Sequence, residues 1–313
     1  MNIVILGAAG FIGTNLTLTL AQDADNRLTL ADVNRQYFQP VEKMQLSNVS
    51  IVESALNPGM DFAPLLRGQD VVYHLVSTTV PGTSNRQIPE EIKANVVFTA
   101  ELLDACVEAG IKRVIFVSSG GTVYGKAGVC PLTEDMPTEP ISSYGLQKLT
   151  IEKLLALYRA THGLDYRVIR LANPYGPYQR PNGVLGAVTT FTYKALKDEP
   201  IQVYGDGSVV RDFIYIEDAV RAILNVAASE SRYRTFNVGG GQGGTSIRQV
   251  LDAVQNALEK PLRVEYTPSR PVDVPENYLD ISRYQQVCGP LNPLPLEEGI
   301  RRTAQFLKEQ YCI

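Results

Sequence analysis

The chain has 313 residues, of which 44% are hydrophobic and 20% are charged, and its formal net charge is −4. This composition is ordinary for a globular protein, and the lack of a polybasic run argues against a nucleic-acid-binding surface. No apolar run approaches the roughly 18 residues that a membrane span needs, and the N-terminal residues lack the features of a signal peptide. We therefore expect a cytoplasmic protein without a nucleic-acid or membrane partner.

The cysteines and histidines give no sign of a metal site or of disulfide bonds. The cysteines lie far apart and share no Cys-x-x-Cys spacing, so we expect reduced thiols: Cys106, Cys130, Cys288 and Cys312. Of the two histidines, His74 ends an apolar strand, where a structural role is favoured over a catalytic one. The chemistry is therefore expected to depend on other side chains.

Short apolar runs alternate with helical patterns through the first half of the chain. The runs are rich in β-branched residues and nearly continuous in hydrophobicity, as in strands that are covered on both faces: residues 3–6, 28–31, 49–52, 71–75, 114–117 and 168–171. Between them lie predicted helices over residues 11–22, 92–109 and 144–161. This alternation predicts an α/β fold with a Rossmann-type, doubly wound parallel sheet.

The regular alternation of strand and helix patterns ends after residue 173. Proline and glycine interrupt any regular pattern between residues 174 and 183, and helical patterns then resume over residues 186–197, 217–229, 246–258 and 296–309. We predict a first domain over residues 1–173 and a smaller C-terminal α/β lobe over residues 174–313. The boundary is soft, because strands of the second part can return to the first domain. Asp218 is expected to cap the helix that follows it.

A glycine-rich turn follows the first predicted strand and opens the first predicted helix. It reads Gly7-Ala8-Ala9-Gly10-Phe11-Ile12-Gly13, and glycine there lets backbone N–H groups approach a pyrophosphate at the positive end of a helix. Asp32 ends the second strand about 20 residues further on, where a carboxylate accepts hydrogen bonds from both ribose hydroxyls and repels a 2′-phosphate. The pattern predicts NAD as the cofactor, although Arg35 lies close enough to keep NADP open.

Tyr144 and Lys148 lie four residues apart, on one face of a predicted helix. A fixed ammonium, joined by the positive charge of an oxidised nicotinamide, favours the phenolate and lowers the pKa of the tyrosine. The phenolate can then remove a proton from a hydroxyl, and the lysine can also hold the nicotinamide ribose.

The Gly-x-x-Gly-x-x-Gly spacing and the Tyr-x-x-x-Lys pair after Pro140-Ile141-Ser142-Ser143 resemble the extended short-chain dehydrogenase/reductase family. Within it, the chain is similar to the NAD-dependent nucleotide-sugar epimerases, such as those of UDP-glucose and UDP-N-acetylglucosamine, from Ile3 to about Thr303. The resemblance implies that Leu75 and Asn95 lie at the cofactor. The family's adenine-binding aspartate is missing from residues 53–56, which leaves backbone groups, Asn57 or Asp61 for that role.

Residues 117–125, hereafter the Gly120 loop, resemble the family's catalytic serine/threonine loop, but the usual hydroxyl position falls on Gly120. Either Ser119 or Thr122 must then orient the sugar hydroxyl, or that role is relaxed; we expect Thr122 and Ser119 to act together. The family's dehydratases carry an Asp-Glu pair in this loop and its uronate decarboxylases a glutamate, where this chain has Gly121 and Thr122. The resemblance therefore implies epimerisation at C4 through a transient 4-keto sugar.

Three later segments resemble the family's motifs for the nucleotide diphosphate. They imply that Asn173 and Arg211 contact the diphosphate, and that Arg270 pairs with a phosphate while Asp273 holds the ribose. A guanidinium suits phosphate oxygens because it can donate two parallel hydrogen bonds.

The resemblance also implies residues around the nucleotide base and the sugar. Tyr204 is expected to flank the base, and Asn277 stands at the family's gate for the C2 substituent, where it slightly favours tolerance of an N-acetyl group. Arg180 could place a guanidinium near C6 of a uronate or simply face water.

The sequence thus predicts an NAD-dependent 4-epimerase that acts on a UDP-hexose, a UDP-N-acetylhexosamine or a UDP-uronate. One alternative is a nucleotide-sugar 4-ketoreductase with the same tyrosine and lysine, although its usual preference for NADPH conflicts with Asp32. Another is a non-catalytic NAD-binding scaffold, against which the intact pair argues. The helices over residues 92–109 and 144–161 resemble those of the family's four-helix dimer interface, so we expect a homodimer.

Overall fold

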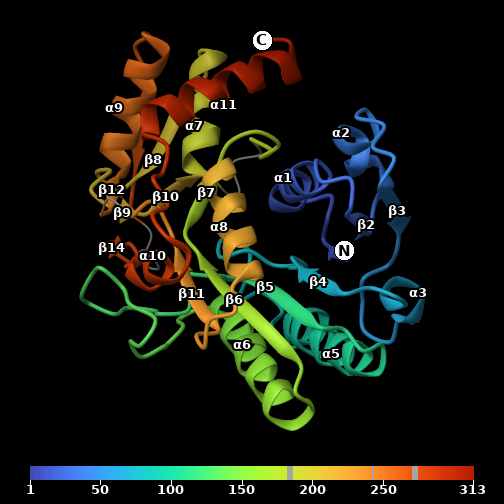
Figure 1. Cartoon of the computed structure of the whole chain (residues 1–313). Coiled ribbons are helices and arrows are strands. Elements are labelled where there is room, and N and C mark those ends of the chain that lie inside the picture. Colours follow the sequence, from blue (N-terminus) through green and yellow to red (C-terminus); the bar gives the residue numbers. More distant parts are fainter. Residues whose placement is uncertain (182–185, 242, 270–273) are drawn as a thin grey trace.

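The computed structural model describes residues 1–181, 186–241, 243–269 and 274–313. Its centre is a seven-stranded parallel sheet with the order β11-β6-β5-β4-β1-β2-β3 (Figure 1). The strands are β1 (Asn2–Leu6), β2 (Arg27–Asp32), β3 (Val49–Glu53), β4 (Val71–His74), β5 (Arg113–Ser119), β6 (Asp165–Leu171) and β11 (Thr235–Val238). The predicted fold class is therefore confirmed.

Helices cover both faces of this sheet, because successive strand residues point to opposite sides. On one face, Ile3 and Ile5 belong to a core shared with α1 (Phe11–Leu20), α8 (Ile216–Ala228) and α10 (Ser282–Cys288). On the other face, Val4 and Leu6 belong to a core shared with α3 (Ala63–Leu66), α5 (Phe98–Glu108) and α6 (Ser143–His162). Two short helices, η1 (Arg35–Phe38) and α2 (Gln39–Glu42), follow β2.

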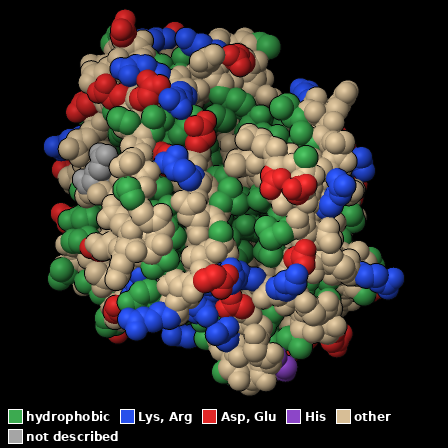
Figure 2. All heavy atoms as spheres, viewed as in Figure 1, with side chains coloured by type: hydrophobic (Ala, Val, Ile, Leu, Met, Phe, Trp, Pro, Cys, Tyr) green, Lys and Arg blue, Asp and Glu red, His purple; other side chains and the backbone are tan. Residues whose placement is uncertain are grey.

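A third core forms the C-terminal lobe, seen above the sheet in Figure 1. Its helices are α7 (Ala187–Leu196), α9 (Ile247–Leu258) and α11 (Leu296–Tyr311). Its small sheets pair β8 (Ile201–Tyr204) with β13 (Val264–Thr267), β7 (Asn173–Tyr175) with β10 (Phe213–Tyr215), and β9 (Val210–Arg211) with both β12 (Thr245–Ser246) and β14 (Glu276–Asn277). In Figure 2, hydrophobic side chains gather in a recess at the centre of this face of the molecule.

Two segments of the second half return to the main sheet. β11 extends the sheet beyond β6, and α8 packs on its face. The sheet therefore includes a strand that lies beyond residue 173 in the sequence. Within the described part of the chain, no helix is long and apolar enough to cross a membrane.

Two local predictions differ from the structure. The helix expected over residues 92–109 is α4 (Ile88–Ile92) continued through a π-helical turn, η2 (Lys93–Val97), into α5. The expected cap at Asp218 is wrong, because its carboxylate accepts from the backbone N–H of Leu294 at 2.7 Å and pairs with Arg221. Asp218 therefore ties α8 to a distant segment, which a local reading of the sequence cannot detect.

Candidate active site

The glycine-rich turn after β1 leaves no room for side chains at two positions. Gly7 has φ of +81°, and a Cβ there would lie 3.0 Å from backbone atoms of Leu75 and Val76. A Cβ on Gly13 would lie 2.6 Å from the carbonyl oxygens of Gly7 and Ala8. Because only glycine fits, the turn brings its own backbone and that of Leu75 into one tight cradle.

This cradle ends at the N-terminus of α1, whose first residues are Phe11 and Ile12. Gly10 is the N-cap, and α1 has neither a side-chain cap nor an acidic residue in its first turn among the residues described. The first N–H groups of a helix carry a partial positive charge and have no partners within the helix. The turn therefore fits the pyrophosphate of NAD.

Asp32 holds the glycine turn in place. Its Oδ2 accepts from the backbone N–H of Ala9 at 2.9 Å, and its Oδ1 accepts from that of Val33 at 2.8 Å. Each carboxylate oxygen has further acceptor capacity, so this half-buried side chain can still bind ribose hydroxyls.

Gly13→Ala is expected to lower both the melting temperature and the amount of NAD that copurifies. The new methyl group would meet backbone oxygens at 2.6 Å, and overpacking of this kind costs about 1–3 kcal/mol. Thermal unfolding and chromatography of the cofactor released on denaturation measure the two effects. Thr19→Ala, on an exposed part of the same helix, is the control and should change neither quantity; a fully loaded Gly13→Ala protein would contradict the assignment.

The structure brings Tyr144 and Lys148 together at the start of α6. Ser142 caps this helix by accepting from the backbone N–H of Gly145 at 3.1 Å. The buried Nζ of Lys148 donates to the carbonyl oxygen of Val117 at 2.9 Å and lies 5.7 Å from the centroid of the Tyr144 ring. A cation and a phenol therefore share one site at the carboxyl end of β5.

Burial changes the ionisation of both groups. It lowers the pKa of Lys148 to about 8, against the opposing effect of the Glu152 carboxylate. It raises the pKa of Tyr144 to about 12, although a hydrogen bond with the Ser119 side chain lowers this pKa. In the protein alone the phenol therefore stays protonated, and the positive charge of oxidised nicotinamide is needed to favour the phenolate.

The hydroxyls of Ser119 and Thr122 in the Gly120 loop have different surroundings. The Ser119 side chain lies close enough to Tyr144 to lower the pKa of its phenol, whereas Oγ1 of Thr122 is buried and has no hydrogen-bond partner in the described part of the chain. A buried hydroxyl without a partner costs about 1–3 kcal/mol. A substrate hydroxyl is the kind of group that would remove this cost.

A buried network of charged and polar side chains holds residues of the Gly120 loop, and it was not predicted from the sequence. Arg170 and Glu152 form an ion pair at 2.7 Å, with both side chains only 6% exposed. Ser118 donates to Glu152 at 2.6 Å, and Arg170 donates to the hydroxyl of Tyr124 at 3.0 Å. The available signal was a charged residue inside the apolar strand β6, together with a glutamate one turn after Lys148.

Asn95 lies in the π-helical turn and is bound to protein groups on every side. Its Oδ1 accepts from the backbone N–H of Thr78 at 2.9 Å, and its Nδ2 donates to Gln147 at 2.7 Å and to the carbonyl oxygen of Glu91 at 2.9 Å. Asn95 therefore links the segment after β4 to α6. A direct contact with the cofactor stays a prediction.

His74, beside Leu75 at the end of β4, has the structural role expected for it. Its Nε2 forms a hydrogen bond with Thr99 at 2.8 Å, and its ring packs against Phe98 and Phe116. Burial lowers its pKa to about 3, so the imidazole is neutral at physiological pH.

A cavity of about 390 Å³ is lined by the C-terminal lobe and by Pro81 and Gly82 after β4, and three of the predicted substrate residues line it, Asn173, Tyr204 and Arg211. Arg211 also donates to the carbonyl oxygens of Val210 and Val274, which fixes its guanidinium at the wall. The predicted residues Arg270 and Asp273 lie outside the described residues.

Asn277 has a position that the sequence did not indicate. It is buried, and its Nδ2 donates to the carbonyl oxygen of Gly121 in the Gly120 loop at 3.3 Å. Asn277 is not among the residues that line the cavity of the lobe. It therefore contacts the backbone of the loop beside Tyr144. Its role as a gate for the C2 substituent of the sugar stays a prediction.

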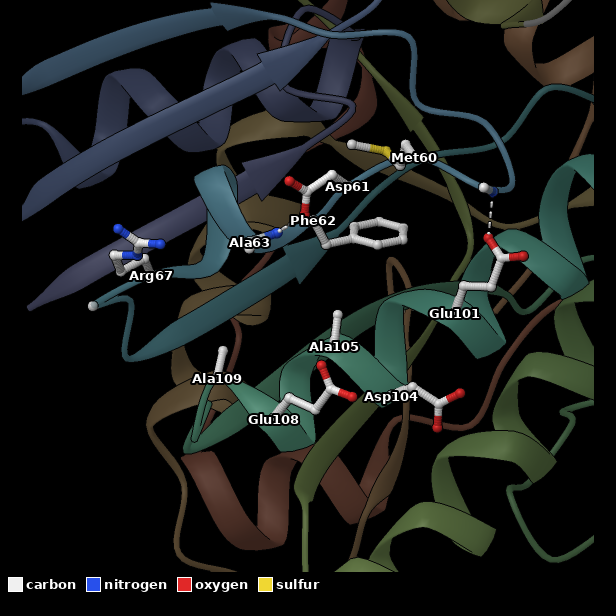
Figure 3. A pocket seen from close by; sticks show the side chains of 12 residues that line it. Met60, Asp61, Phe62, Ala63, Arg67, Glu101, Asp104, Ala105, Glu108 and Ala109 are labelled. Atoms are coloured by element: carbon white, nitrogen blue, oxygen red, sulfur yellow. Dashed lines mark hydrogen bonds between the residues drawn. The ribbon is translucent and has the colours of Figure 1, made fainter.

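A separate hollow of about 620 Å³ lies between α3 and α5 (Figure 3). Glu101, Asp104 and Glu108 line it from α5, and Glu101 accepts from the backbone N–H of Gly59 at 2.7 Å. Asp61, one of the alternatives for binding the adenine, also lines it, but Tyr144, Lys148 and the glycine turn do not, and carboxylates repel a diphosphate. The hollow is therefore separate from the candidate active site.

The chain is similar to known proteins over nearly its whole length. The chain matches the model of the NAD dependent epimerase/dehydratase family over residues 3–239. It is 33% identical to the UDP-glucose 4-epimerase of Mycolicibacterium smegmatis over 317 aligned residues, which cover 99% of each chain.

Two solved structures share the whole fold. A UDP-glucose 4-epimerase of Thermotoga maritima with UDP-glucose superimposes with a TM-score of 0.91 and 30% identity, covering 99% of this chain and 100% of that one. A UDP-glucuronic acid 4-epimerase of Bacillus cereus, in complex with UDP-glucuronic acid and NAD, gives a TM-score of 0.89 and 26% identity, with the same coverage.

Proposed function

The chain belongs to the NAD-dependent epimerase/dehydratase family, and we propose that it interconverts the C4 epimers of a nucleotide sugar. The observation that carries this proposal is the meeting of Tyr144, Lys148 and Ser119 at the carboxyl end of β5. The first domain, residues 1–173, would hold NAD, and the lobe formed by residues 174–313 would hold the nucleotide diphosphate.

The residues of the chain divide the work of the reaction. The glycine turn and Asp32 would hold NAD, which would supply the removal of a hydride from C4 and its return to the opposite face of the sugar. Tyr144 takes the proton of the C4 hydroxyl and gives it back, while Ser119 holds the phenol oxygen in place. Lys148 supplies a positive charge beside the phenolate and can donate to the nicotinamide ribose. Thr122 offers its unpaired hydroxyl to the sugar.

Epimerisation requires a firm grip on the nucleotide and a loose grip on the hexose, because the 4-keto sugar must turn over between the two transfers. The lobe supplies the grip through Arg211 and Asn173 at the wall of the cavity. The Gly120 loop has Gly121 and Thr122 where a dehydratase needs an acid and a base, so elimination is not supported.

Among possible sugars, the contacts favour a hexose or an N-acetylhexosamine. The guanidinium of Arg180, the candidate partner for a uronate, lies 3.8 Å from the centroid of the Tyr37 ring on η1. The charge that a uronate would need is therefore engaged elsewhere.

The substrate is tested by incubating the purified protein separately with UDP-glucose, UDP-N-acetylglucosamine and UDP-glucuronate, followed by chromatography of the products. We expect a C4 epimer from one or both of the first two. Conversion of UDP-glucuronate alone would overturn the proposed substrate class.

The four cysteines are all unpaired, which is consistent with our further proposal that the enzyme works in the cytoplasm.

We also propose that the enzyme is a homodimer through α5 and α6. Apolar side chains are exposed on α6 and directly before α5, with Val97, Leu146 and Leu157 at 41%, 46% and 53% exposure. Leu146 and Leu157 are eleven residues apart, about three helical turns, and so lie on the same face of α6, as expected for an interaction surface.

Leu157→Glu is expected to convert a dimer into a monomer, because it would bury a charge in the shared face. Light scattering at micromolar concentration measures the mass. Ile141→Glu, an equally exposed apolar residue that precedes α6, is the matched control and should leave the dimer intact. A monomeric wild-type protein would refute the assembly.

A further inference from the structure

Position 120 and Leu279 compete for one space. A Cβ on Gly120 would lie 2.5 Å from Cδ1 and 3.0 Å from Cδ2 of Leu279, and 3.1 Å from the carbonyl oxygen of Arg170. Ordinary contacts between carbon atoms are about 3.5–4.0 Å. The φ angle of Gly120 is not in the left-handed region, so its backbone conformation does not demand glycine. Glycine is needed because the neighbouring atoms leave no room for a side chain.

Leu279 cannot easily move away from Gly120, because its backbone is held from two sides. Its N–H donates to the buried carboxylate of Asp212 at 3.1 Å. On either side of it, Leu132 donates to the carbonyl oxygen of Tyr278 at 2.9 Å and accepts from the N–H of Asp280 at 2.8 Å. The side chain is 3% exposed within the main core, so a rotation would have to displace other packed groups.

The Gly120 loop is confined on its other side by α6. A Cβ on Gly145 would lie 2.7 Å from the carbonyl oxygen of Thr122, so the loop and the helix that carries Tyr144 are in close contact. Asn277, two residues before Leu279, donates to Gly121. The loop therefore lies between the Tyr144 helix and a segment that comes from the C-terminal part of the chain.

We propose that Leu279 is a positioning residue for the proposed epimerisation. Its side chain fills the space that a side chain at position 120 would need, and this contact keeps the loop in the position in which Ser119 lies beside Tyr144. The hydroxyl absent at position 120 is thus replaced by a neighbour in the loop. Asp212 holds Leu279 and directly follows Arg211, so the segment that binds the diphosphate also holds the loop in place.

The test is a double-mutant cycle with Gly120→Ser, Leu279→Ala and the combined variant. Gly120→Ser should lower kcat for UDP-glucose by about tenfold or more, because displacing reacting groups by about 1 Å can cost 100-fold. Leu279→Ala should lower kcat similarly while KM and the NAD content stay within about twofold. In the combined variant the serine fills the vacated space, so kcat should return to within a few-fold of wild type.

Leu291→Ala is the matched control, since Leu291 is 2% exposed in the same core and does not meet Gly120. It should lower the melting temperature about as much as Leu279→Ala but leave kcat unchanged. Equal losses of kcat in the two leucine variants would reduce Leu279 to an ordinary core residue and overturn the proposal.

Thermal unfolding gives a readout that does not depend on the proposed reaction. Gly120→Ser should lower the melting temperature strongly in the wild-type background and little or not at all in Leu279→Ala. An equal decrease in both backgrounds would overturn the competition for space, even for a protein that epimerises no sugar. Conversely, coupled melting temperatures without any turnover would retain the contact and refute the proposed function alone.

Discussion

Tyr144→Phe is expected to lower kcat at least about 100-fold, since general acid–base catalysis contributes about 10²–10⁴ in rate. In the proposed reaction the phenol exchanges a proton with the C4 hydroxyl, and its neighbours Ser119 and Lys148 stay in the variant. The fold and the NAD content should be unchanged, because only one oxygen atom is removed. Product formation under saturating nucleotide sugar measures kcat, and circular dichroism checks the fold.

Tyr158→Phe provides the control for this prediction. Tyr158 lies on the same helix, but its hydroxyl donates to Asp104 on α5 at 2.6 Å, away from Lys148. Its removal should leave kcat close to that of the wild type. Near-full activity of Tyr144→Phe would contradict the assignment of the proton-transfer group.

Arg170→Met is expected to lower the free energy of unfolding by about 3–5 kcal/mol, the cost of removing one partner from a buried ion pair. Glu152 would lose its ion-pair partner and keep a hydrogen bond from Ser118 inside the core. The substitution removes a donor to Tyr124 as well. Urea denaturation followed by circular dichroism gives the free energy.

The combined variant Arg170→Met, Glu152→Met should recover much of this loss, because two apolar side chains of similar size leave no unpaired charge. As a control, Arg302→Met removes an ion pair with Glu298 in which both side chains are about half exposed (46% and 41%). Its stability should stay close to that of the wild type. An Arg170→Met protein as stable as the wild type would show that the pair is not needed.

Local patterns were sufficient for much of the fold. The parallel sheet followed from β-branched runs that alternate with helices, and the glycine turn followed from its glycine spacing between a strand and a helix. The structure adds that Gly7 and Gly13 leave no room for a side chain. Tyr144 and Lys148 could be paired from sequence alone because four residues is one helical turn. NAD dependence and membership of the epimerase family are confirmed by the comparisons.

Contacts between distant segments could not be predicted in the same way. The bond from Asn277 to Gly121 and the contact of Leu279 with Gly120 join residues more than 150 positions apart. Asp218 looked like a helix cap because it lies in the first turn of α8, but its partner is Leu294. The π-helical turn around Asn95 likewise depends on Gln147 and Thr78 from other elements. Such roles are set by packing, and a single sequence shows only one partner of each pair.

The central claim is that a hydride leaves C4 of a nucleotide sugar and returns to the same carbon within one protein. It is tested most directly by incubating the purified protein, with no added cofactor, with UDP-glucose and UDP-N-acetylglucosamine that carry deuterium at C4. We predict C4 epimers that retain the deuterium, because the hydride never leaves the site. Epimers that have lost the deuterium to water, or no epimer from either sugar even with NAD added, would contradict the account.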